Sequence, residues 1–446
     1  MRRELERAKE LASSHEFVRV ISHYDADGIS GGYVATRALM RAGLSPHLTT
    51  TRSLPADDIQ DYLDNGTRLL ILVDIGASLI KELAEMDLDV IVLDHHRVME
   101  TDDRVVYINP NLFGMDGMKD LSGSTTAFLF ALSLDESNWD LAPYALIGAM
   151  GDRQHIGGLS GTNRLIADRS IEQGLLVVKK QMKLSEKTVY DSILYSVDPF
   201  LKGITGRAQQ VEEFLREVRI DGSTLTADLT ADSSAGRMAE MSNYINSIVI
   251  LRLIEQGCTP ETLENLVSDT YYMSAGERSL ENMAALVDAC GRMGKNGVGF
   301  ELLNGTKGAE SEASALREEH RSRIRSRLIE LEDEPPEKME AIQYFYSEEP
   351  TISGAVAGIG REYLFDHDMP AFGLSISDGK VEISARGSNE LVERGLNLAE
   401  ACRKAAESVG GRGGGHPIAS GATIPEGTDT EFLRLADEIV KEQLGR

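Results

Sequence analysis

The stretch VIVLDHHRV, residues 90–98, decides how the rest of the chain is interpreted. Its aliphatic residues 90–93 are followed at once by Asp94, His95 and His96. A short apolar run of this kind predicts a buried strand, so the polar residues come at the carboxyl end of that strand. We expect the strand to deliver a carboxylate and two imidazoles to a site at the edge of a sheet.

Short apolar runs and amphipathic segments alternate on both sides of this stretch. The expected strands cover residues 17–22, 47–53, 68–76, 89–96 and 105–111. Repeated alternation of strand and helix predicts an α/β fold, with a parallel sheet and helices on both of its faces. In such sheets ligands bind beyond the carboxyl ends of the strands.

The composition limits the class of protein. The chain has 446 residues, of which 41% are hydrophobic and 26% are charged, so we expect several domains with ordinary apolar cores. No apolar run approaches the roughly 20 residues of a membrane span, and the charged N-terminus lacks the apolar centre of a signal peptide. We therefore expect a cytoplasmic protein with no membrane partner.

Charge and cysteine content narrow the chemistry. The formal net charge of −26 argues against non-specific binding of nucleic acid over the whole surface. A local basic channel remains compatible with it, and divalent cations in an acidic site can supply the positive charge that phosphates need. The three cysteines are far apart and form no CxxC pair, which argues against a disulfide framework and a thiolate zinc site.

The pattern divides the chain into three parts. Residues 1–160 form the expected catalytic α/β domain. Residues 161–335 have mostly helical periodicity, and the proline-containing stretch EDEPPEK, residues 332–338, is typical of a boundary linker. Residues 336–446 return to alternating strands and helices, which predicts a smaller C-terminal α/β domain that faces the first across a cleft.

His23, Asp25 and Asp27 follow the first expected strand in the sequence HYDAD. Alternate residues of an extended segment share a face, so one imidazole and two carboxylates can converge. Such a mixed set suits Mn²⁺. The alternative interpretation is a polar turn in which Asp27 caps the following helix, and the triplet alone does not decide between them.

Two further aspartates follow apolar segments. Asp74 comes directly after an expected strand, and by itself it could equally cap the next helix. Asp152 follows the apolar segment 141–151, at the end of a helix where the dipole favours cations. A carboxylate is unfavourable at this end of a helix, and a metal nearby would offset that cost. Taken alone, however, Asp152 is better interpreted as a loop carboxylate.

These acidic ends and the two adjacent histidines suffice for two metals that share Asp74 as a bridge. Two cations about 4 Å apart clamp a phosphate and lower the pKa of a bridging water. We therefore predict hydrolysis of a phosphoester or phosphoanhydride. The candidate metal ligands are His23, Asp25, Asp27, Asp74, His95 and Asp152.

The motifs resemble a known family. SHYDADGIS, LVDIG, VLDHH and GAMGD resemble, in order and spacing, the four motifs of the DHH phosphoesterase superfamily, and GGRGGGHPIASGA resembles the GGGH motif of the DHH-associated C-terminal domain. The chain is most similar to the archaeal RecJ-like exonucleases. This resemblance implies single-stranded DNA or RNA as the substrate. For some members it also implies association with the GINS complex of the replicative helicase.

The resemblance also implies residue roles. One metal would be held by His23, Asp25 and Asp74, and the other by Asp27, Asp74, His95 and Asp152. His96 would contact the scissile phosphate or act as a general acid, and Asp94 would support an imidazole. The terminal nucleotide or phosphate would be received by Arg386, Gly413, Gly414, Gly415 and His416. The expected cofactors are two divalent cations, for which Mn²⁺ fits the ligands better than Ca²⁺, with Mg²⁺ as the alternative.

The glycine run has a physical interpretation of its own. Glycines let backbone N–H groups approach an anion closely and form a nest, whereas the alternative is a flexible surface turn. Arg386 could likewise form an ordinary salt bridge at a strand end.

Other functions compete with the exonuclease. Within the hydrolases, the chain could be an oligoribonuclease, a cyclic-dinucleotide phosphodiesterase or an inorganic pyrophosphatase. It could instead be a scaffold subunit of the replication helicase with reduced nuclease activity, although the complete ligand set argues against a pure scaffold. A haloacid-dehalogenase-type phosphatase would explain DADGIS, but it leaves the DHH and GGGH residues without a role.

Overall fold

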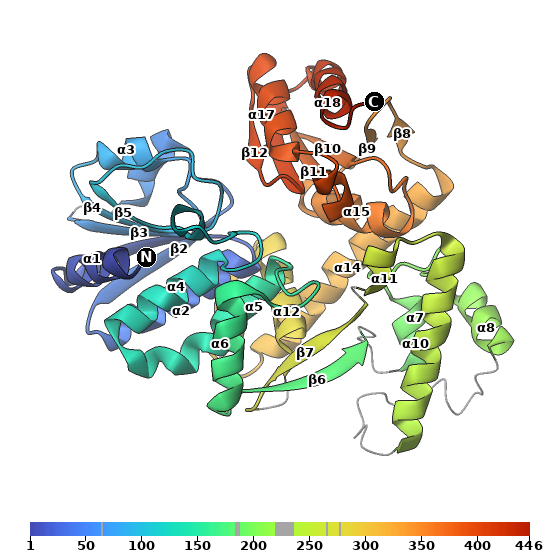
Figure 1. Cartoon of the computed structure of the whole chain (residues 1–446), viewed down its shortest axis with the longest axis horizontal. Coiled ribbons are helices and arrows are strands. Elements are labelled where there is room, and N and C mark those ends of the chain that lie inside the picture. The colour runs from blue at the N-terminus through green and yellow to red at the C-terminus, as the bar shows by residue number, and fades with distance from the viewer. Residues whose placement is uncertain (64–65, 183–187, 219–235, 265, 276–277) are drawn as a thin grey trace. The chain divides into compact units, whose positions relative to one another are not determined.

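The computed structural model describes residues 1–63, 66–182, 188–218, 236–264, 266–275 and 278–446 (Figure 1). The chain forms two compact units. The first comprises residues 1–181 and 268–318, and the second comprises residues 182–267 and 319–446. The three-part division by role that the sequence suggests stays a prediction.

The first unit is built on a parallel sheet of five strands. They are β1 (Phe17–His23), β2 (Ser45–Thr51), β3 (Leu69–Val73), β4 (Asp89–Leu93) and β5 (Val105–Ile108), in the order β2-β1-β3-β4-β5. The chain moves outward from β1 to β2 in one direction and from β3 to β5 in the other. The order therefore reverses between β1 and β3, which is where a sheet of this kind opens a crevice for a ligand.

Helices cover both faces of this sheet. On one face lie α1 (Arg2–Ser13), α2 (Ala26–Arg41) and α4 (Gly123–Leu134), and on the other lie the 3₁₀ helix η1 (Ala56–Tyr62) and α3 (Ile80–Ala84) (Figure 1). Side chains alternate between the faces because successive residues of a strand point in opposite directions. In β3, Leu69, Ile71 and Val73 join one core, and Leu70 and Leu72 join the other. The predicted fold class is confirmed.

The rest of the first unit packs around α2. Helix α5 (Ala142–Gly151) contacts α2, α4, α6 (Gly161–Glu172) and α12 (Leu280–Arg292), and α13 (Asn296–Leu303) also contacts α2. Strands β6 (Leu176–Met182) and β7 (Val267–Met273) form a two-stranded sheet. That sheet interrupts a region predicted to be mostly helical, of which residues 183–187, 219–235, 265 and 276–277 lie outside the described structure.

The second unit contains a mixed sheet of six strands in the order β12-β13-β11-β10-β9-β8. The strands are β8 (Glu337–Lys338), β9 (Gln343–Tyr346), β10 (Ala371–Ser377), β11 (Lys380–Arg386), β12 (Arg412–Gly415) and β13 (Ala419–Pro425). Helices α17 (Leu398–Ser408) and α18 (Asp429–Gln443) share an apolar core with the sheet, and α15 (Pro350–Tyr363) packs on β10 and β11. This confirms the expected C-terminal α/β region.

The remaining described α-helices are short or charged, apart from α10. They are α7 (Val189–Leu194), α8 (Ala208–Glu217), α10 (Gly236–Gln256), α11 (Pro260–Glu264), α14 (Ala309–Asp333) and α16 (Asn389–Glu393). Helix α14 continues from the first unit into the second. Among the residues that the structure describes, no helix combines the length and apolar character that crossing a bilayer requires.

Candidate metal centre

Three neighbouring strands end at the predicted site. His23 is the last residue of β1, Asp74 follows β3, and Asp94 follows β4. The register pairs Ser22 with Val73 and Val73 with Leu93, so the three strand ends lie side by side at the carboxyl edge of the sheet, where the strand order reverses. The structure therefore brings these separate strand ends together, and their role as one site stays a prediction.

The first group of possible ligands contains His23, Asp25 and Asp74. Nδ1 of His23 lies 2.9 Å from Oδ2 of Asp25 and 3.5 Å from Oδ2 of Asp74. The other oxygen of Asp25 accepts a hydrogen bond from the backbone N–H of Gly28 at 3.1 Å, which makes Asp25 the N-cap of α2. The alternative interpretation of this turn, with Asp27 as the cap, is wrong, because Asp27 lies inside the helix and is fully buried.

The second group contains Asp27, Asp74 and His95. Nε2 of His95 lies 3.2 Å from Oδ1 of Asp74 and 3.9 Å from Oδ2 of Asp27. Asp152 follows α5, and its Oδ2 lies 3.1 Å from the same nitrogen. The three carboxylates proposed for one metal therefore converge on the imidazole nitrogen of the fourth proposed ligand, His95.

The backbone fixes which nitrogen of His95 faces these carboxylates. Nδ1 of His95 lies 2.6 Å from the carbonyl oxygen of Gly117. Because a carbonyl only accepts, Nδ1 carries the hydrogen, and Nε2 is directed at the carboxylates. Burial alone would lower the pKa of His95, but Asp152 and Asp74 raise that pKa well above its usual value. A group of carboxylates that stabilises a proton on Nε2 would equally stabilise a divalent cation there.

Asp27 is held by the N-terminus of α4. Its Oδ1 accepts hydrogen bonds from the hydroxyls of Ser122 and Ser124, and its Oδ2 accepts one from the backbone N–H of Gly123 at 2.7 Å. Burial and the nearby charge of Asp74 raise the pKa of Asp27 to about 6. Sequence reasoning missed this support, although the capping pair Ser122 and Thr125 marks the start of a helix.

Asp74 has a carboxylate oxygen in each group. Oδ2 faces His23 and Oδ1 faces His95. Its backbone φ is +57°, a left-handed conformation that costs a residue with a side chain about 1–3 kcal/mol. The N–H of Asp74 still pairs with the carbonyl of Leu93 at 2.8 Å. This left-handed turn at the end of β3 places the carboxylate between the two groups.

The side chains fit divalent cations. Among the described residues, Nδ1 of His23 and Oδ1 of Asp74 are buried atoms that make no hydrogen bond of acceptable geometry, although charged groups lie within 2.9 and 3.2 Å. Buried polar atoms without hydrogen bonds are uncommon in proteins. Imidazole nitrogen and carboxylate oxygen are ligand types that Mn²⁺ accepts, so a cation in each group would satisfy these atoms.

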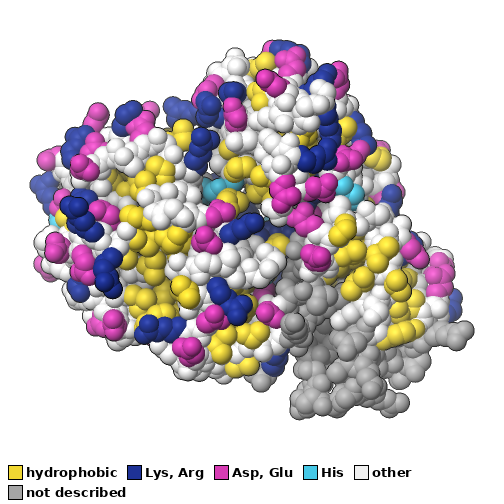
Figure 2. Space-filling view, in the orientation of Figure 1, with side chains coloured by type: hydrophobic (Ala, Val, Ile, Leu, Met, Phe, Trp, Pro, Cys, Tyr) yellow, Lys and Arg dark blue, Asp and Glu magenta, His cyan; other side chains and the backbone are white. Residues whose placement is uncertain are grey.

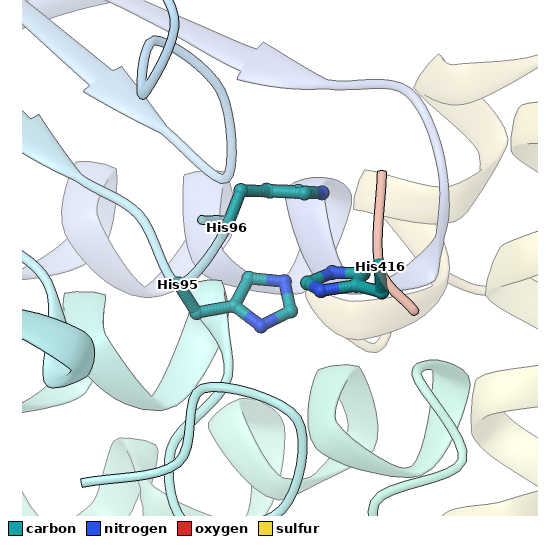
Figure 3. Close-up of side chains that lie close together, drawn as sticks. All are labelled: His95, His96 and His416. Atoms are coloured by element: carbon teal, nitrogen blue, oxygen red, sulfur yellow. The ribbon is translucent and has the colours of Figure 1, made fainter. Parts of the chain in front are cut away.

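Asp94 and His96 have a different arrangement. Oδ1 of Asp94 accepts a hydrogen bond from Nδ1 of His96 at 2.7 Å and one from the N–H of His95, while its Oδ2 accepts one from the N–H of Ala77. Burial would raise the pKa of Asp94, but the two imidazoles hold it well below its usual range. The His96 side chain is 38% exposed, and Figure 3 shows its ring and that of His95 extending from the same loop after β4.

The candidate residues of the second unit lie at one end of its sheet. Arg386 is the last residue of β11 and is paired with Ala419 of β13. The N–H of His416, which follows β12, donates to the carbonyl of Ala419 at 2.9 Å. Arg386 and His416 therefore lie on either side of one residue of β13.

The glycine run forms a strand. Gly413, Gly414 and Gly415 belong to β12, which pairs with β13 and is an edge strand of the sheet. The predicted nest and its alternative, a flexible turn, are therefore both wrong as descriptions of the backbone. A Cβ on Gly413 would lie 2.5 Å from the carbonyl oxygen of Cys402, and Gly415 has a φ of +137°. The absence of a side chain at residue 413 thus lets the edge strand pack closely on α17.

Comparison with known proteins defines the family. The DHH family N-terminal domain matches residues 17–150, and the DHHA1 domain matches residues 341–442. The chain therefore belongs to the DHH superfamily, whose members are phosphoesterases. Within that superfamily it is a RecJ-like protein.

Three relatives illustrate this. An uncharacterized protein of Methanocaldococcus jannaschii is 29% identical over 447 residues, which cover 98% of this chain and 96% of that protein. The single-stranded-DNA-specific exonuclease RecJ of Bacillus subtilis is 26% identical over 260 residues, covering 52% of this chain and only 32% of RecJ. The crystal structure of RecJ from Thermus thermophilus in complex with Mn²⁺ matches with a TM-score of 0.60 and 20% identity, over 98% of this chain and 55% of that one. This structural likeness establishes a shared fold.

Proposed function

We propose that the chain is a metal-dependent exonuclease that hydrolyses single-stranded DNA or RNA from an end. The observation that carries the proposal is the carboxylate of Asp74, which presents one oxygen to His23 and the other to His95. That geometry suits a bridge between two cations. The RecJ relative of Bacillus subtilis is a single-stranded-DNA-specific exonuclease, which supports the choice of substrate.

The residues divide the work of such a site. His23, Asp25 and Asp74 would hold one cation, and the other would be held by Asp27, Asp74, His95 and Asp152. When bound, the pair would neutralise a phosphate and supply a nucleophilic water near neutral pH. The hydrogen bond that His95 donates to Gly117 and those from α4 to Asp27 keep these ligands in place.

His96 would act on the substrate. Its Nδ1 is committed to Asp94, so Nε2 is the atom available to donate a hydrogen bond to the scissile phosphate or a proton to the leaving oxygen. Asp94 accepts four hydrogen bonds and stays ionised, which fixes the orientation of the imidazole.

Arg386, His416 and the edge strand β12 would receive the strand's terminal nucleotide. Arg386 supplies a planar cation that suits phosphate, and an edge strand leaves one row of backbone groups unpaired within its sheet. Figure 2 shows acidic and basic side chains interspersed over the visible face of the described residues, so binding through defined groups is favoured over binding through general charge.

A substrate panel tests the proposal. Single-stranded DNA and RNA labelled at the 5′ or the 3′ end are incubated with the protein and Mn²⁺ or Mg²⁺, beside dinucleotides, cyclic dinucleotides and pyrophosphate. We expect progressive shortening of the strands from one end. Intact strands together with hydrolysis of the small substrates would contradict the exonuclease and support the small-substrate alternative. Association with GINS is a separate prediction, which co-purification from the native source would test.

A further inference from the structure

Helix α12 lies unusually close to the loop at the end of β1, residues 23–25, although more than 250 residues separate the two in the chain. A Cβ on Gly291 would lie 1.9 Å from the carbonyl oxygen of Tyr24, the residue between His23 and Asp25. Only a residue without a side chain allows this contact. The end of α12 is therefore seated directly on the loop that carries two of the proposed ligands.

The next residue of α12, Arg292, contacts Tyr24 through its side chain. Nη1 of Arg292 donates a hydrogen bond to the Tyr24 hydroxyl at 2.6 Å, and its guanidinium lies 5.1 Å from the centre of the Tyr24 ring. Asp288, one turn earlier in α12, lies 3.3 Å from Nε of Arg292 and fixes the other side of the guanidinium. Arg292 is thus held between its own helix and Tyr24.

Tyr24 in turn contacts His23, which lies beside Asp25. Its ring packs edge to face on the His23 imidazole, with centroids 4.8 Å apart and planes at 86°. The same imidazole lies 2.9 Å from Asp25, and the positive charge of Arg292 also acts on the Asp25 carboxylate. The path from α12 to the ligands therefore runs from Arg292 through Tyr24 to His23 and Asp25.

We propose that Arg292 is a positioning residue of the metal centre, which acts through Tyr24 to hold His23 and Asp25 in the geometry that binds a divalent cation. The inference rests on the proposed function. It adds a residue outside the DHH motifs and gives α12, in the region between the two α/β parts, a role in metal binding.

Two effects of Arg292 on a cation have opposite signs. Its positive charge repels a cation, so removing the charge would tighten binding if Coulomb repulsion dominated. Its hydrogen bond to Tyr24 orients the ligands, so removing that bond would weaken binding if orientation dominated. Because Asp288 already offsets much of the charge, we expect orientation to dominate.

The test is isothermal titration of the full chain with Mn²⁺ alone, which counts the ions and gives an affinity for each. The variants are Tyr24→Phe, Arg292→Met and the double variant. Tyr24→Phe removes the hydroxyl that accepts the hydrogen bond and keeps the positive charge of Arg292. Arg169→Met is the matched control, because Arg169 stacks on Trp139 in the same unit at 4.4 Å but contacts no proposed ligand. Asp152→Asn, which alters only the other group, shows which affinity belongs to which group.

We expect Tyr24→Phe and Arg292→Met each to weaken one of the two Mn²⁺ affinities about tenfold, as loss of a residue that supports a ligand commonly does. The double variant should bind Mn²⁺ no more weakly than Arg292→Met does, because Arg292 acts on the ligands through Tyr24. Arg169→Met should leave both affinities unchanged. Unchanged or tighter Mn²⁺ binding by Tyr24→Phe and Arg292→Met would overturn this inference and leave the proposed function standing. A wild-type protein that binds no Mn²⁺ would overturn the proposed function together with it.

Discussion

Gly123 leaves room for the two carboxylates at the centre of the site. A Cβ on this residue would lie 2.6 Å from Cβ of Asp74 and 2.9 Å from Oδ2 of Asp27. Gly123→Ala should therefore displace both ligands and lower kcat by about 100-fold, since a shift of about 1 Å in a catalytic group can cost that much. Steady-state kinetics with Mn²⁺ measure the effect.

Gly297→Ala is the matched control for this substitution. Gly297 lies in α13 of the same unit, and a Cβ there would have no heavy atom within 4 Å. The control should keep wild-type kcat. Equal activity of Gly123→Ala and wild type would show that the positions of these carboxylates do not limit the reaction.

His96 can be separated from the metal ligands by experiment. Asp74, Asp94 and His96 could also hold an ion by distance alone, so the role of His96 is open to test. We expect His96→Ala to lower kcat about 100-fold, as loss of a general acid does, and to leave Mn²⁺ affinity unchanged. A parallel loss of Mn²⁺ affinity would make His96 a ligand instead.

The residues of the site were predictable where the chain places them directly after apolar strands. His23, Asp74 and His95 follow a pattern in which the polar residue comes at the strand's end, and the structure brings them together. Ser122 and Arg292 were missed because their contacts depend on tertiary packing, and a serine at a helix start or an arginine at a helix end is common in any protein. Their side chains reach the site from elements distant in sequence.

At the scale of the element, substitutions in β12 can distinguish its packing role from its proposed role in substrate binding. Gly413 touches the backbone of α17, whereas a Cβ on Gly414 would meet no heavy atom within 4 Å. Gly413→Ala should lower the Tm. Gly414→Ala should leave the Tm unchanged and raise KM for single strands, because a methyl group keeps a phosphate from the backbone. Thermal melts and kinetics distinguish these outcomes, and an unchanged KM for Gly414→Ala would remove this strand from substrate capture.

The same strand shows what the sequence could not predict about elements. The parallel sheet of the first unit was predictable, because strands such as β3, residues 69–73, are continuous aliphatic runs and helical periods separate the strands. The run RGGG has no apolar residue and no β propensity of its own. It forms a strand because β13 supplies hydrogen bonds and α17 packs closely on it. Strands β6 and β7 also pair although they lie far apart in the chain, which no local pattern reveals.

At the scale of the whole molecule, all the proposed metal ligands belong to one unit. They lie within residues 1–181. A ligand that binds only the folded state stabilises it, by about 2.7 kcal/mol for each site at a concentration of about 100 Kd. Mn²⁺ should therefore slow amide hydrogen exchange in the first unit, most strongly at the ends of β1, β3 and β4, and leave the second unit unchanged.

Asp74→Asn provides the control for this experiment. Asparagine has almost the same shape and also tolerates the left-handed backbone conformation of Asp74. The variant should fold, and it should lose the protection that Mn²⁺ provides. Protection spread evenly over both units, in the wild type or in the variant, would contradict binding at the predicted site.

The most direct test of the central claim compares the wild type and Asp74→Asn on end-labelled single strands in Mn²⁺. Because Asp74 is the residue whose two oxygens face both ligand groups, the account predicts that the wild type shortens the strands, that a chelator stops it, and that the variant is folded but inactive. A folded Asp74→Asn variant that degrades the strands at the wild-type rate would contradict the two-metal site.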